Sequence, residues 1–196
     1  ILGRMMEHCL ELESKKTGKV RRANILCETS GDTGPAAVSS VVLNTKHAHI
    51  FCLFPQKQVT AMQARQLTTM MPKHKNVSIY ATDRNSDDQW MAVKRIFNDR
   101  SFVTEYNICA MNSIHWIRIC VQMCYYFYSY FQVCPKIDQS VTFVIPSGAF
   151  GNTCAAIFAR KIGLPIHSIV PSTNENDIVY QTLTLGNFSW PNNYHK

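Results

Sequence analysis

The sequence lacks an apolar segment long enough to cross a membrane. Its most hydrophobic stretch, residues 114–133, is rich in aliphatic and aromatic side chains but is interrupted by Arg118, Gln122 and Ser129. A membrane-spanning helix needs about 20 consecutive, predominantly apolar residues. We therefore expect no membrane span, and we interpret this stretch as a helix that is buried on most of its circumference.

Paired-cysteine motifs and a secretory signal are absent as well. The eight cysteines include no Cys-x-x-Cys pair, and Cys120 and Cys124 lie one helical turn apart, which is not the spacing of a zinc site. Cys27 and Cys52 lie inside apolar runs. Charged residues interrupt the first twelve positions, so no signal peptide is recognisable. We expect reduced, buried thiols, no metal site, and a cytoplasmic or mitochondrial location.

Acidic residues are few. The 196 residues contain 13 Asp and Glu against 20 Lys and Arg, which gives a net charge of +7. Such a balance suits nucleic-acid binding, but the basic residues are scattered and no nucleic-acid-binding motif is recognisable. We prefer ordinary surface lysines and expect no nucleic-acid partner, although an anionic small substrate would also suit this charge. With 46% hydrophobic and 17% charged residues, the composition excludes a disordered chain.

The sequence does contain a repeated switch between helical and strand periodicity. Helical patterns cover residues 1–16, 34–44, 58–71, 87–98, 113–131 and 152–162. Short apolar runs that suit buried strands cover residues 23–28, 48–54, 77–81, 141–145 and 166–170. Alternating strands and helices predict βαβ units on mostly parallel sheets. The irregular residues 100–112 separate the first units from the last, so we expect two α/β lobes.

A glycine-containing loop stands between the strand pattern that ends at residue 145 and the helical pattern that follows it. In residues 147–152, Gly148 and Gly151 allow backbone N–H groups to approach an anion at the start of the next helix. This is the chemistry of a phosphate-binding loop. A tight strand-to-helix turn, in which glycine only relieves strain, remains an equally good interpretation.

A second polar loop, residues 29–34, follows the first predicted strand. Thr29, Ser30 and Thr33 carry hydroxyls that can donate to a carboxylate or a phosphate. We interpret Asp32 or Thr33 as the N-cap of the next helix, and Asp32 as a cap rather than a general base. Ligands of open α/β sheets bind beyond the carboxyl ends of the strands, which is where both loops are expected.

Four segments of the chain resemble motifs of the threonine synthase family. Residues 28–37 resemble its SGDTG signature, residues 112–118 its NSINWxR segment, residues 145–152 its VPTGNFGN loop and residues 173–177 its TNxND segment. The four stand in the family's order. The resemblance extends from residue 1 to about residue 190 and is closest to the threonine synthase-like proteins of animals.

This resemblance implies a fold and an activity. The fold would be α/β, the fold type II of pyridoxal-phosphate enzymes (tryptophan synthase beta-like), with mostly parallel sheets and flanking helices. Residues 1–110 would form a small domain that carries the SGDTG loop, and residues 111–196 an incomplete large, cofactor-binding domain. The cofactor would be pyridoxal 5'-phosphate. The substrate would be O-phosphohomoserine or O-phosphothreonine, converted to threonine or 2-oxobutyrate with release of phosphate.

Residues that match the family's motifs are implied to form the site. Those expected to bind the cofactor phosphate are Gly148, Ala149, Phe150, Gly151 and Asn152. Those expected to bind the substrate are Ser30, Gly31, Asp32, Thr33, Ser113, Arg118, Asn176 and Asp177. Arg118 would contact the substrate phosphate through its planar guanidinium, whereas an arginine on the surface of a helix is the alternative interpretation. His115 and Ala149 stand where the family usually has Asn.

The lysine that holds the cofactor in this family has no counterpart here. The F-K-D segment that carries it would precede Ile1, while Lys15, Lys16 and Lys19 lie at the polar end of the first predicted helix. The sequence also begins without a methionine. We interpret it as a truncated chain that is inactive alone and that self-associates or is completed by another chain. The alternative is a secreted, non-enzymatic signalling factor, because a truncated, osteoclast-inducing form of a threonine synthase-like protein is known in this family.

Overall fold

The computed structural model describes residues 1–112, 115–136, 138–148 and 150–186. The chain divides into two compact units, Ile1–His115 and Trp116–Lys196. Each unit contains its own parallel sheet, so the two lobes expected from the periodicity are present.

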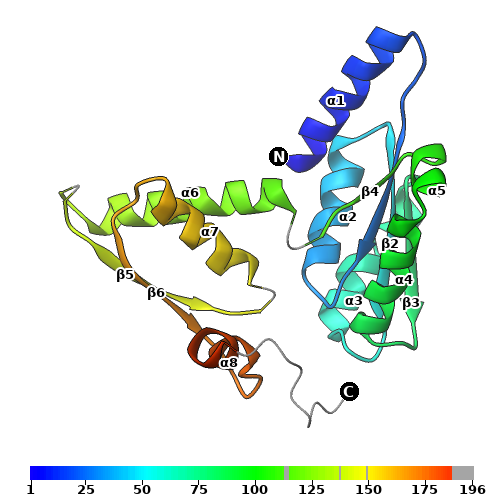
Figure 1. The fold of residues 1–196 in the computed structure, drawn as a ribbon. Coiled ribbons are helices and arrows are strands. Elements are labelled where there is room, and N and C mark those ends of the chain that lie inside the picture. Colours follow the sequence, from blue (N-terminus) through cyan, green and yellow to red (C-terminus); the bar gives the residue numbers. More distant parts are fainter. Residues whose placement is uncertain (113–114, 137, 149, 187–196) are drawn as a thin grey trace. The chain divides into compact units, whose positions relative to one another are not determined.

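In the first unit, strands and helices alternate as the sequence predicts as far as residue 98 (Figure 1). Residues 100–112, which were expected to be irregular, instead contain a short helix and a strand of the same sheet. The helices are α1 (Leu2–Thr17), α2 (Thr33–Asn44), α3 (Ala61–Thr68), α4 (Ser86–Asn98) and α5 (Arg100–Glu105), with a 3₁₀ turn η1 (Met71–Lys73). The strands are β1 (Ala23–Glu28), β2 (Ala48–Pro55), β3 (Val77–Thr82) and β4 (Ile108–Ala110).

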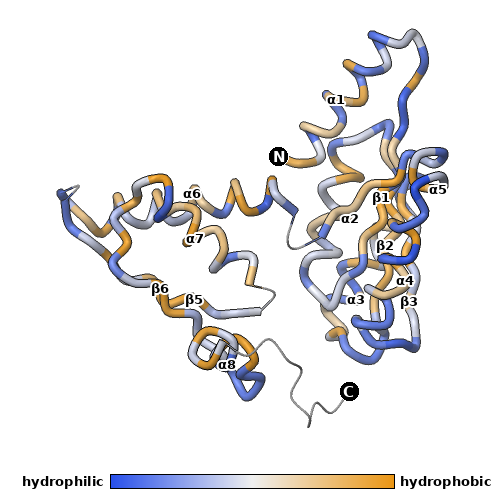
Figure 2. The backbone as a smooth tube through the Cα atoms, viewed as in Figure 1, coloured by the Kyte–Doolittle hydropathy of each residue, from blue (hydrophilic) through white to orange (hydrophobic). Residues whose placement is uncertain are grey.

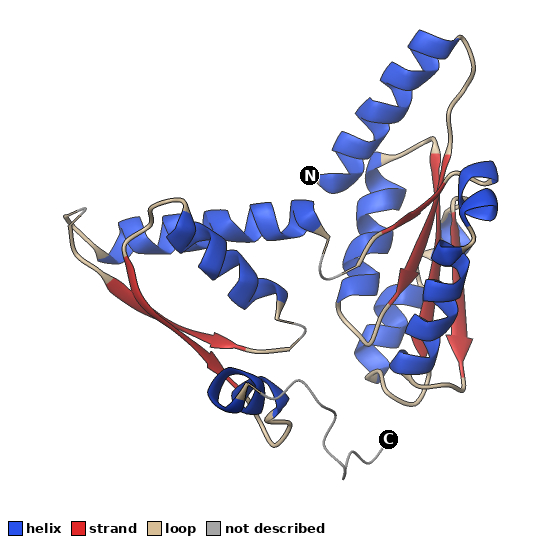
Figure 3. Cartoon of the chain, viewed as in Figure 1, coloured by secondary structure: helices blue, strands red, loops and turns tan. Residues whose placement is uncertain are grey.

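The four strands form a parallel sheet in the order β3-β2-β1-β4. The chain steps from β1 to β2 and on to β3 in one direction. It then returns through α4 and α5 to β4, on the other side of β1. Because such crossovers are right-handed, the two directions place their helices on opposite faces of the sheet, and Figure 3 shows helices on both sides.

The core of the first unit lies between the sheet and α2. Every second residue of β1 and β2 points into it, and Ile25, Cys27, Ile50 and Cys52 are fully inaccessible to solvent. They pack against the buried alanine and valines of α2. Cys27 and Cys52 are thus buried as expected, whereas Cys9 and Cys124 are exposed, which corrects the expectation of buried thiols. No disulfide links the cysteines in the described part of the chain.

Helix α1 is amphipathic, and Figure 2 shows hydrophobic and hydrophilic residues alternating along it. Its apolar residues Leu2, Met6 and Leu10 pack against the core. Gly18, with φ of 66°, ends the helix in the left-handed conformation that glycine adopts most easily. The helix and its glycine stop were both predicted from the sequence.

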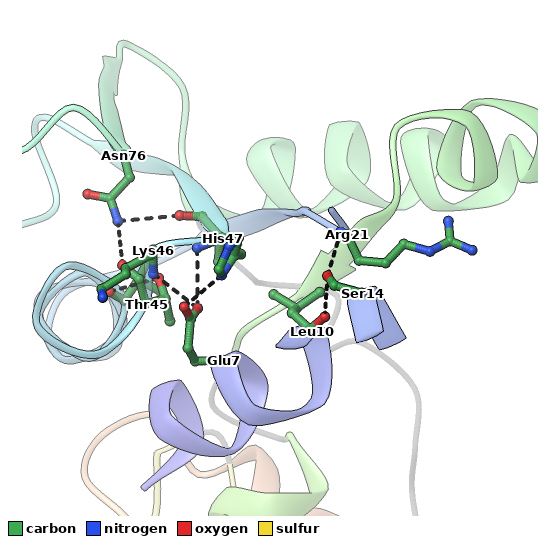
Figure 4. Close-up of polar contacts among 10 residues, drawn as sticks. Glu7, Leu10, Ser14, Arg21, Thr45, Lys46, His47 and Asn76 are labelled. Carbon is green, nitrogen blue, oxygen red and sulfur yellow. Dashed lines mark hydrogen bonds and ion pairs between the residues drawn. The ribbon is translucent and has the colours of Figure 1, made fainter. Parts of the chain in front are cut away.

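Glu7 fastens α1 to the turn between α2 and β2 (Figure 4). Its carboxylate accepts hydrogen bonds from the Lys46 and His47 amides at 3.0 and 3.2 Å, and it lies 2.8 Å from Nδ1 of the His47 ring. Burial opposes ionisation of this carboxyl, but the hydrogen bonds to Lys46 and His47 outweigh it and hold the pKa of Glu7 below its ordinary value.

The second unit contains α6 (Trp116–Val133), β5 (Val141–Pro146), α7 (Gly151–Lys161), β6 (Ile166–Ser172) and α8 (Ile178–Leu185). Strands β5 and β6 pair in parallel, and α6 and α7 lie on one side of them (Figure 3). Ala155, Ala156 and Ala159 of α7 are fully buried in the core of this unit. Their small side chains allow α7 to approach its neighbours closely.

Helix α6 corrects one expectation from the sequence. It is not buried on most of its circumference, because Tyr125, Tyr128 and Phe131 are 57%, 69% and 57% exposed. Only the face with Ile119, Tyr126 and Tyr130 is buried. The described part of the chain contains no helix with both the length and the apolar character that a membrane crossing requires.

Candidate functional site

The strand order of the first unit defines where a ligand would bind. The chain leaves β1 toward one face of the sheet and reaches β4 from the other, so the order reverses between these two neighbouring strands. Open α/β sheets bind ligands at such a switch point, beyond the carboxyl ends of the strands. Residues 29–32 follow β1 there, and Met111 and Asn112 follow β4.

Thr29 organises the loop after β1. Its side chain is 2% exposed, and its Oγ1 accepts hydrogen bonds from the Gly31 and Gly34 amides at 3.1 and 2.9 Å. These bonds satisfy two amides at the start of α2 that have no partner within the helix. The Thr29 hydroxyl, which was expected to be able to donate to a ligand, thus accepts two hydrogen bonds within the turn.

Asp32 does not cap α2 with its side chain, which corrects a second expectation. Its Oδ1 instead accepts a hydrogen bond from Gln63 Nε2 at 2.8 Å. Gln63 also accepts a hydrogen bond from the Thr60 amide at 2.9 Å, as part of the capping box of α3. The exposed carboxylate of Asp32 is thereby tied to the N-terminus of the next helix.

Of the two glycines of this loop, Gly34 is required by close packing, because a Cβ atom there would overlap the Thr29 methyl group. A Cβ atom on Gly31 would lie 2.5 Å from Gln63 Nε2 and would displace the end of that side chain. Ser30 is exposed and Thr33 is half-buried. Ser30 therefore remains as the hydroxyl of this loop that a ligand can reach most easily.

Glu28, the last residue of β1, precedes this loop. Partial burial raises the pKa of its carboxyl above the ordinary value. In the loop after β4, the Met111 amide donates to the Leu26 carbonyl at 3.4 Å, which extends the pairing with β1. Ser113, which was expected to bind substrate, lies outside the described residues.

The second candidate loop joins β5 to α7. The Ser147 amide donates to the Ser172 carbonyl at 2.9 Å, which anchors the start of the loop to β6. Phe150 precedes α7 with φ of 61°, a left-handed conformation that is unusual for a residue with a side chain. Such a conformation costs about 1–3 kcal/mol and is found preferentially at functional sites. Ala149 lies outside the described residues.

Two hydroxyl groups flank this loop without partners. Ser147 Oγ and Thr153 Oγ1 are buried, and neither has a hydrogen-bond partner among the described residues. Thr153 is 1% exposed. A Cβ atom placed on Gly148 would meet nothing within 4 Å, so the space above this glycine is open. Unpaired hydroxyls, an open glycine and a helix N-terminus together fit an anionic group such as a phosphate.

Tyr126 of α6 contacts the end of the same loop through Asn152. Its hydroxyl lies 2.7 Å from Asn152 Oδ1 and 3.0 Å from the Asn152 carbonyl oxygen. The ring is 5% exposed and packs edge-on against Phe143, with centroids 4.9 Å apart. Burial raises the pKa of Tyr126 to about 12, so at neutral pH its hydroxyl carries the proton that it donates.

Helix α8 lies beside the phosphate-loop candidate. A cavity of about 530 Å³ is lined by Phe150 and by Ile178, Val179, Thr182 and Leu183 of α8. Asn176 is exposed, and its backbone N–H donates to Asn174 Oδ1 at 3.0 Å. Asp177 Oδ1 accepts from Gln181 Nε2 at 2.8 Å. These two expected site residues thus shape the turn into α8.

Arg118 is the third residue of α6 and is half-buried. A cation in the first turn of a helix stands against the positive end of the helix dipole. Such a position is unfavourable by itself and becomes favourable when an anion is bound beside it. The placement therefore suits the expected contact with a substrate phosphate.

A larger cavity of about 820 Å³ in the first unit does not belong to this site. Arg21, Arg22 and Asn24 line it at the amino end of β1, with Asn107 and Ile108 at the amino end of β4. Ligands of open α/β sheets bind at the opposite, carboxyl ends. All lysines in the described part of the chain are exposed, so none of them is a desolvated amine of the kind that holds a cofactor covalently.

No family model matches the chain. Threonine synthase-like 2 of Rattus norvegicus is 40% identical over 182 residues, which cover 91% of this chain and 36% of that protein. The PLP-bound threonine synthase of Brucella melitensis is 37% identical, with a TM-score of 0.76 over 93% of this chain and 37% of that one. Threonine synthase of Escherichia coli is 30% identical, with a TM-score of 0.79 over 95% of this chain and 42% of that one.

The fold and the two strand-end loops first define a class: an α/β protein with the fold type II architecture of pyridoxal-phosphate enzymes. Sequence and structure together then give the family. The chain belongs to the threonine synthase family, as its motifs predict, and it spans little more than a third of the length of these relatives.

Proposed function

We propose that residues 147–152 bind the phosphate of pyridoxal 5'-phosphate, and that this chain is the phosphate-holding part of a pyridoxal-phosphate-dependent lyase or synthase. The observation that carries the proposal is the pair of buried, unpartnered hydroxyls of Ser147 and Thr153 beside the N-terminus of α7. A phosphate with several acceptor oxygens would satisfy both hydroxyls and the free amides of the first helical turn.

Each residue of the loop would have a distinct part in this binding. Gly148 leaves room for the phosphate, and the left-handed backbone of Phe150 turns the chain into the helix. Gly151 and Asn152, the first residues of α7, would donate their amides, as would Ala149. The bound cofactor would supply an electron sink for the Cα–H bond of an amino-acid substrate.

We extend the proposal to a phosphorylated amino acid as substrate, either O-phosphohomoserine or O-phosphothreonine, with threonine or 2-oxobutyrate and phosphate as products. The relatives named as threonine synthases support this substrate class. Ser30, Gly31, Asp32 and Thr33 would meet its carboxylate or the cofactor ring, while Ser113 and Arg118 would bind its phosphate. Asn176 and Asp177 would line the approach to the cofactor.

We further propose that residues 1–110 correspond to the small domain and residues 111–196 to part of the large domain of the family. The chain by itself would lack turnover, because every lysine in its described part is exposed. No observation on these residues or on the relatives favours the secreted signalling factor, so we do not propose that function.

The test is equilibrium binding of pyridoxal 5'-phosphate and of pyridoxal, which lacks the phosphate, to the full 196-residue chain. The expected result is at least about tenfold tighter binding of the phosphorylated form, because a phosphate adds several charge-assisted hydrogen bonds. Equal affinity for the two compounds would contradict the proposal. Phosphate release from O-phosphohomoserine should be absent, and a stoichiometric adduct on one lysine that borohydride reduces would overturn the claim that the chain lacks turnover.

A further inference from the structure

Tyr126 is a buried polar group that neither sequence pattern nor family motif singles out. It lies in the middle of α6, ten residues after Trp116, where the helix begins. Two of the four tyrosines of this helix, Tyr125 and Tyr128, are 57% and 69% exposed, whereas Tyr126 and Tyr130 are buried. Tyr126 turns its ring into the core and its hydroxyl toward the start of α7.

The hydroxyl lies within hydrogen-bond distance of two oxygens of one residue, 2.7 Å from Asn152 Oδ1 and 3.0 Å from the Asn152 carbonyl oxygen. Because the hydroxyl has a single proton to donate, the shorter contact, to Oδ1, is the one that orients the Asn152 side chain. Because the oxygen of the Asn152 amide is held by Tyr126, its Nδ2 is the end that remains to donate to a ligand. Asn152 itself is exposed.

We propose that Tyr126 is a positioning residue for the phosphate loop: its hydroxyl orients Asn152 so that the amide donors at the N-terminus of α7 are arranged for an anion before one binds. This inference rests on the proposed function of residues 147–152. It assigns a role to a residue outside the loop, on a different helix, that acts through Asn152.

Tyr126→Phe removes only the hydroxyl and keeps the packing against Phe143. Tyr125→Phe is the matched control, because it removes an exposed hydroxyl from the adjacent position of the same helix. The first readout needs no ligand. In the full chain with ¹⁵N-labelled asparagine, the Asn152 side-chain amide signals should move toward random-coil values in Tyr126→Phe and stay unchanged in Tyr125→Phe.

The second readout is the ratio of the dissociation constants of pyridoxal and pyridoxal 5'-phosphate. Tyr126→Phe should lower this ratio about fivefold, the effect of one lost hydrogen bond, and Tyr125→Phe should leave it unchanged. A merely structural role would weaken both ligands equally or change only the melting temperature.

The outcomes separate the inference from the proposed function. Unchanged Asn152 signals in Tyr126→Phe, or an unchanged ratio in a chain that prefers the phosphorylated ligand, would overturn the positioning role. A wild-type chain that binds both ligands equally would overturn the proposed phosphate site itself, and the inference with it.

Discussion

Thr153 is the residue at which stability and binding are expected to conflict. A buried hydroxyl without a partner destabilises the folded state, because it has lost its hydrogen bonds to water. Thr153→Val keeps the shape of the side chain and removes that hydroxyl. We predict that the ligand-free chain gains about 1 kcal/mol in free energy of unfolding, while affinity for pyridoxal 5'-phosphate falls.

Thermal unfolding without ligand and equilibrium titration of the same variant measure the two effects. Thr142→Val, on an exposed position of β5, is the control and should change neither quantity appreciably. A Thr153→Val variant that is less stable than wild type would show that the hydroxyl already has a partner in the ligand-free protein.

Gly34 and Gly148 are predicted to differ although both stand in candidate loops. An added methyl group at Gly34 would overlap Thr29, whereas at Gly148 it would meet nothing. Gly34→Ala should therefore lower the free energy of unfolding by about 1–3 kcal/mol. Gly148→Ala should leave stability nearly unchanged and weaken phosphate binding, because its methyl group would occupy the space of the anion. Urea denaturation of the two variants compares them, and equal losses would contradict the packing argument.

At the scale of elements, helix α1 is held to the rest of its unit by few polar contacts, and Glu7 makes several of them. Glu7→Gln removes the charge while keeping the shape. The free energy of unfolding of the variant should be about 1 kcal/mol lower than that of wild type at neutral pH, the magnitude of one charge-assisted hydrogen bond. Glu105→Gln, at the exposed end of α5 and away from Glu7 and His47, is the control.

The stability difference between wild type and Glu7→Gln depends on pH in a way that follows from the lowered pKa of Glu7. The pKa of Glu7 is lower in the folded chain than in the unfolded chain. Its contribution is therefore present above the ordinary carboxyl pKa and is lost as the pH falls through the folded value. The difference between wild type and Glu7→Gln should shrink from about pH 5 toward about pH 3, where the carboxyl itself takes up its proton. A difference that grows between these two pH values would contradict the assignment.

Most elements were predictable from the sequence because their periodicity is strong. The alternation in residues 23–28 gives a strand with the bounds that β1 has. Helix α8 was missed, since its β-branched residues Ile178, Val179, Thr182 and Thr184 favour a strand by local propensity. The signal that could have found it is Gly186, which ends the helix in the left-handed conformation with φ of 64°.

Side-chain roles within the loops were less predictable than the loops themselves. The sequence predicts that Asp32 or Thr33 caps the helix that begins here, and the side chain of either residue suits a helix start. Only the fold decides between them, by bringing Gln63 from α3 within reach of Asp32. The role of Tyr126 was not predictable either, because its contact with Asn152 joins residues 26 positions apart.

At the scale of the whole molecule, the chain shares the fold of its relatives and spans little more than a third of their length. Two separate parallel sheets each end in a loop that matches a family motif, and the relatives carry the same fold. The described lysines are all exposed. The central claim is therefore about binding: residues 147–152 form an anion site that is arranged before a ligand arrives.

The most direct test is a titration of the full chain with inorganic phosphate, followed by the backbone amide signals in ¹H–¹⁵N spectra. The account predicts saturable shifts at about millimolar phosphate, concentrated at the amides of Gly148, Phe150, Gly151 and Asn152 and reduced in Thr153→Val. Shifts confined to exposed basic segments, such as the one containing Arg21 and Arg22, with these four amides unchanged, would contradict it.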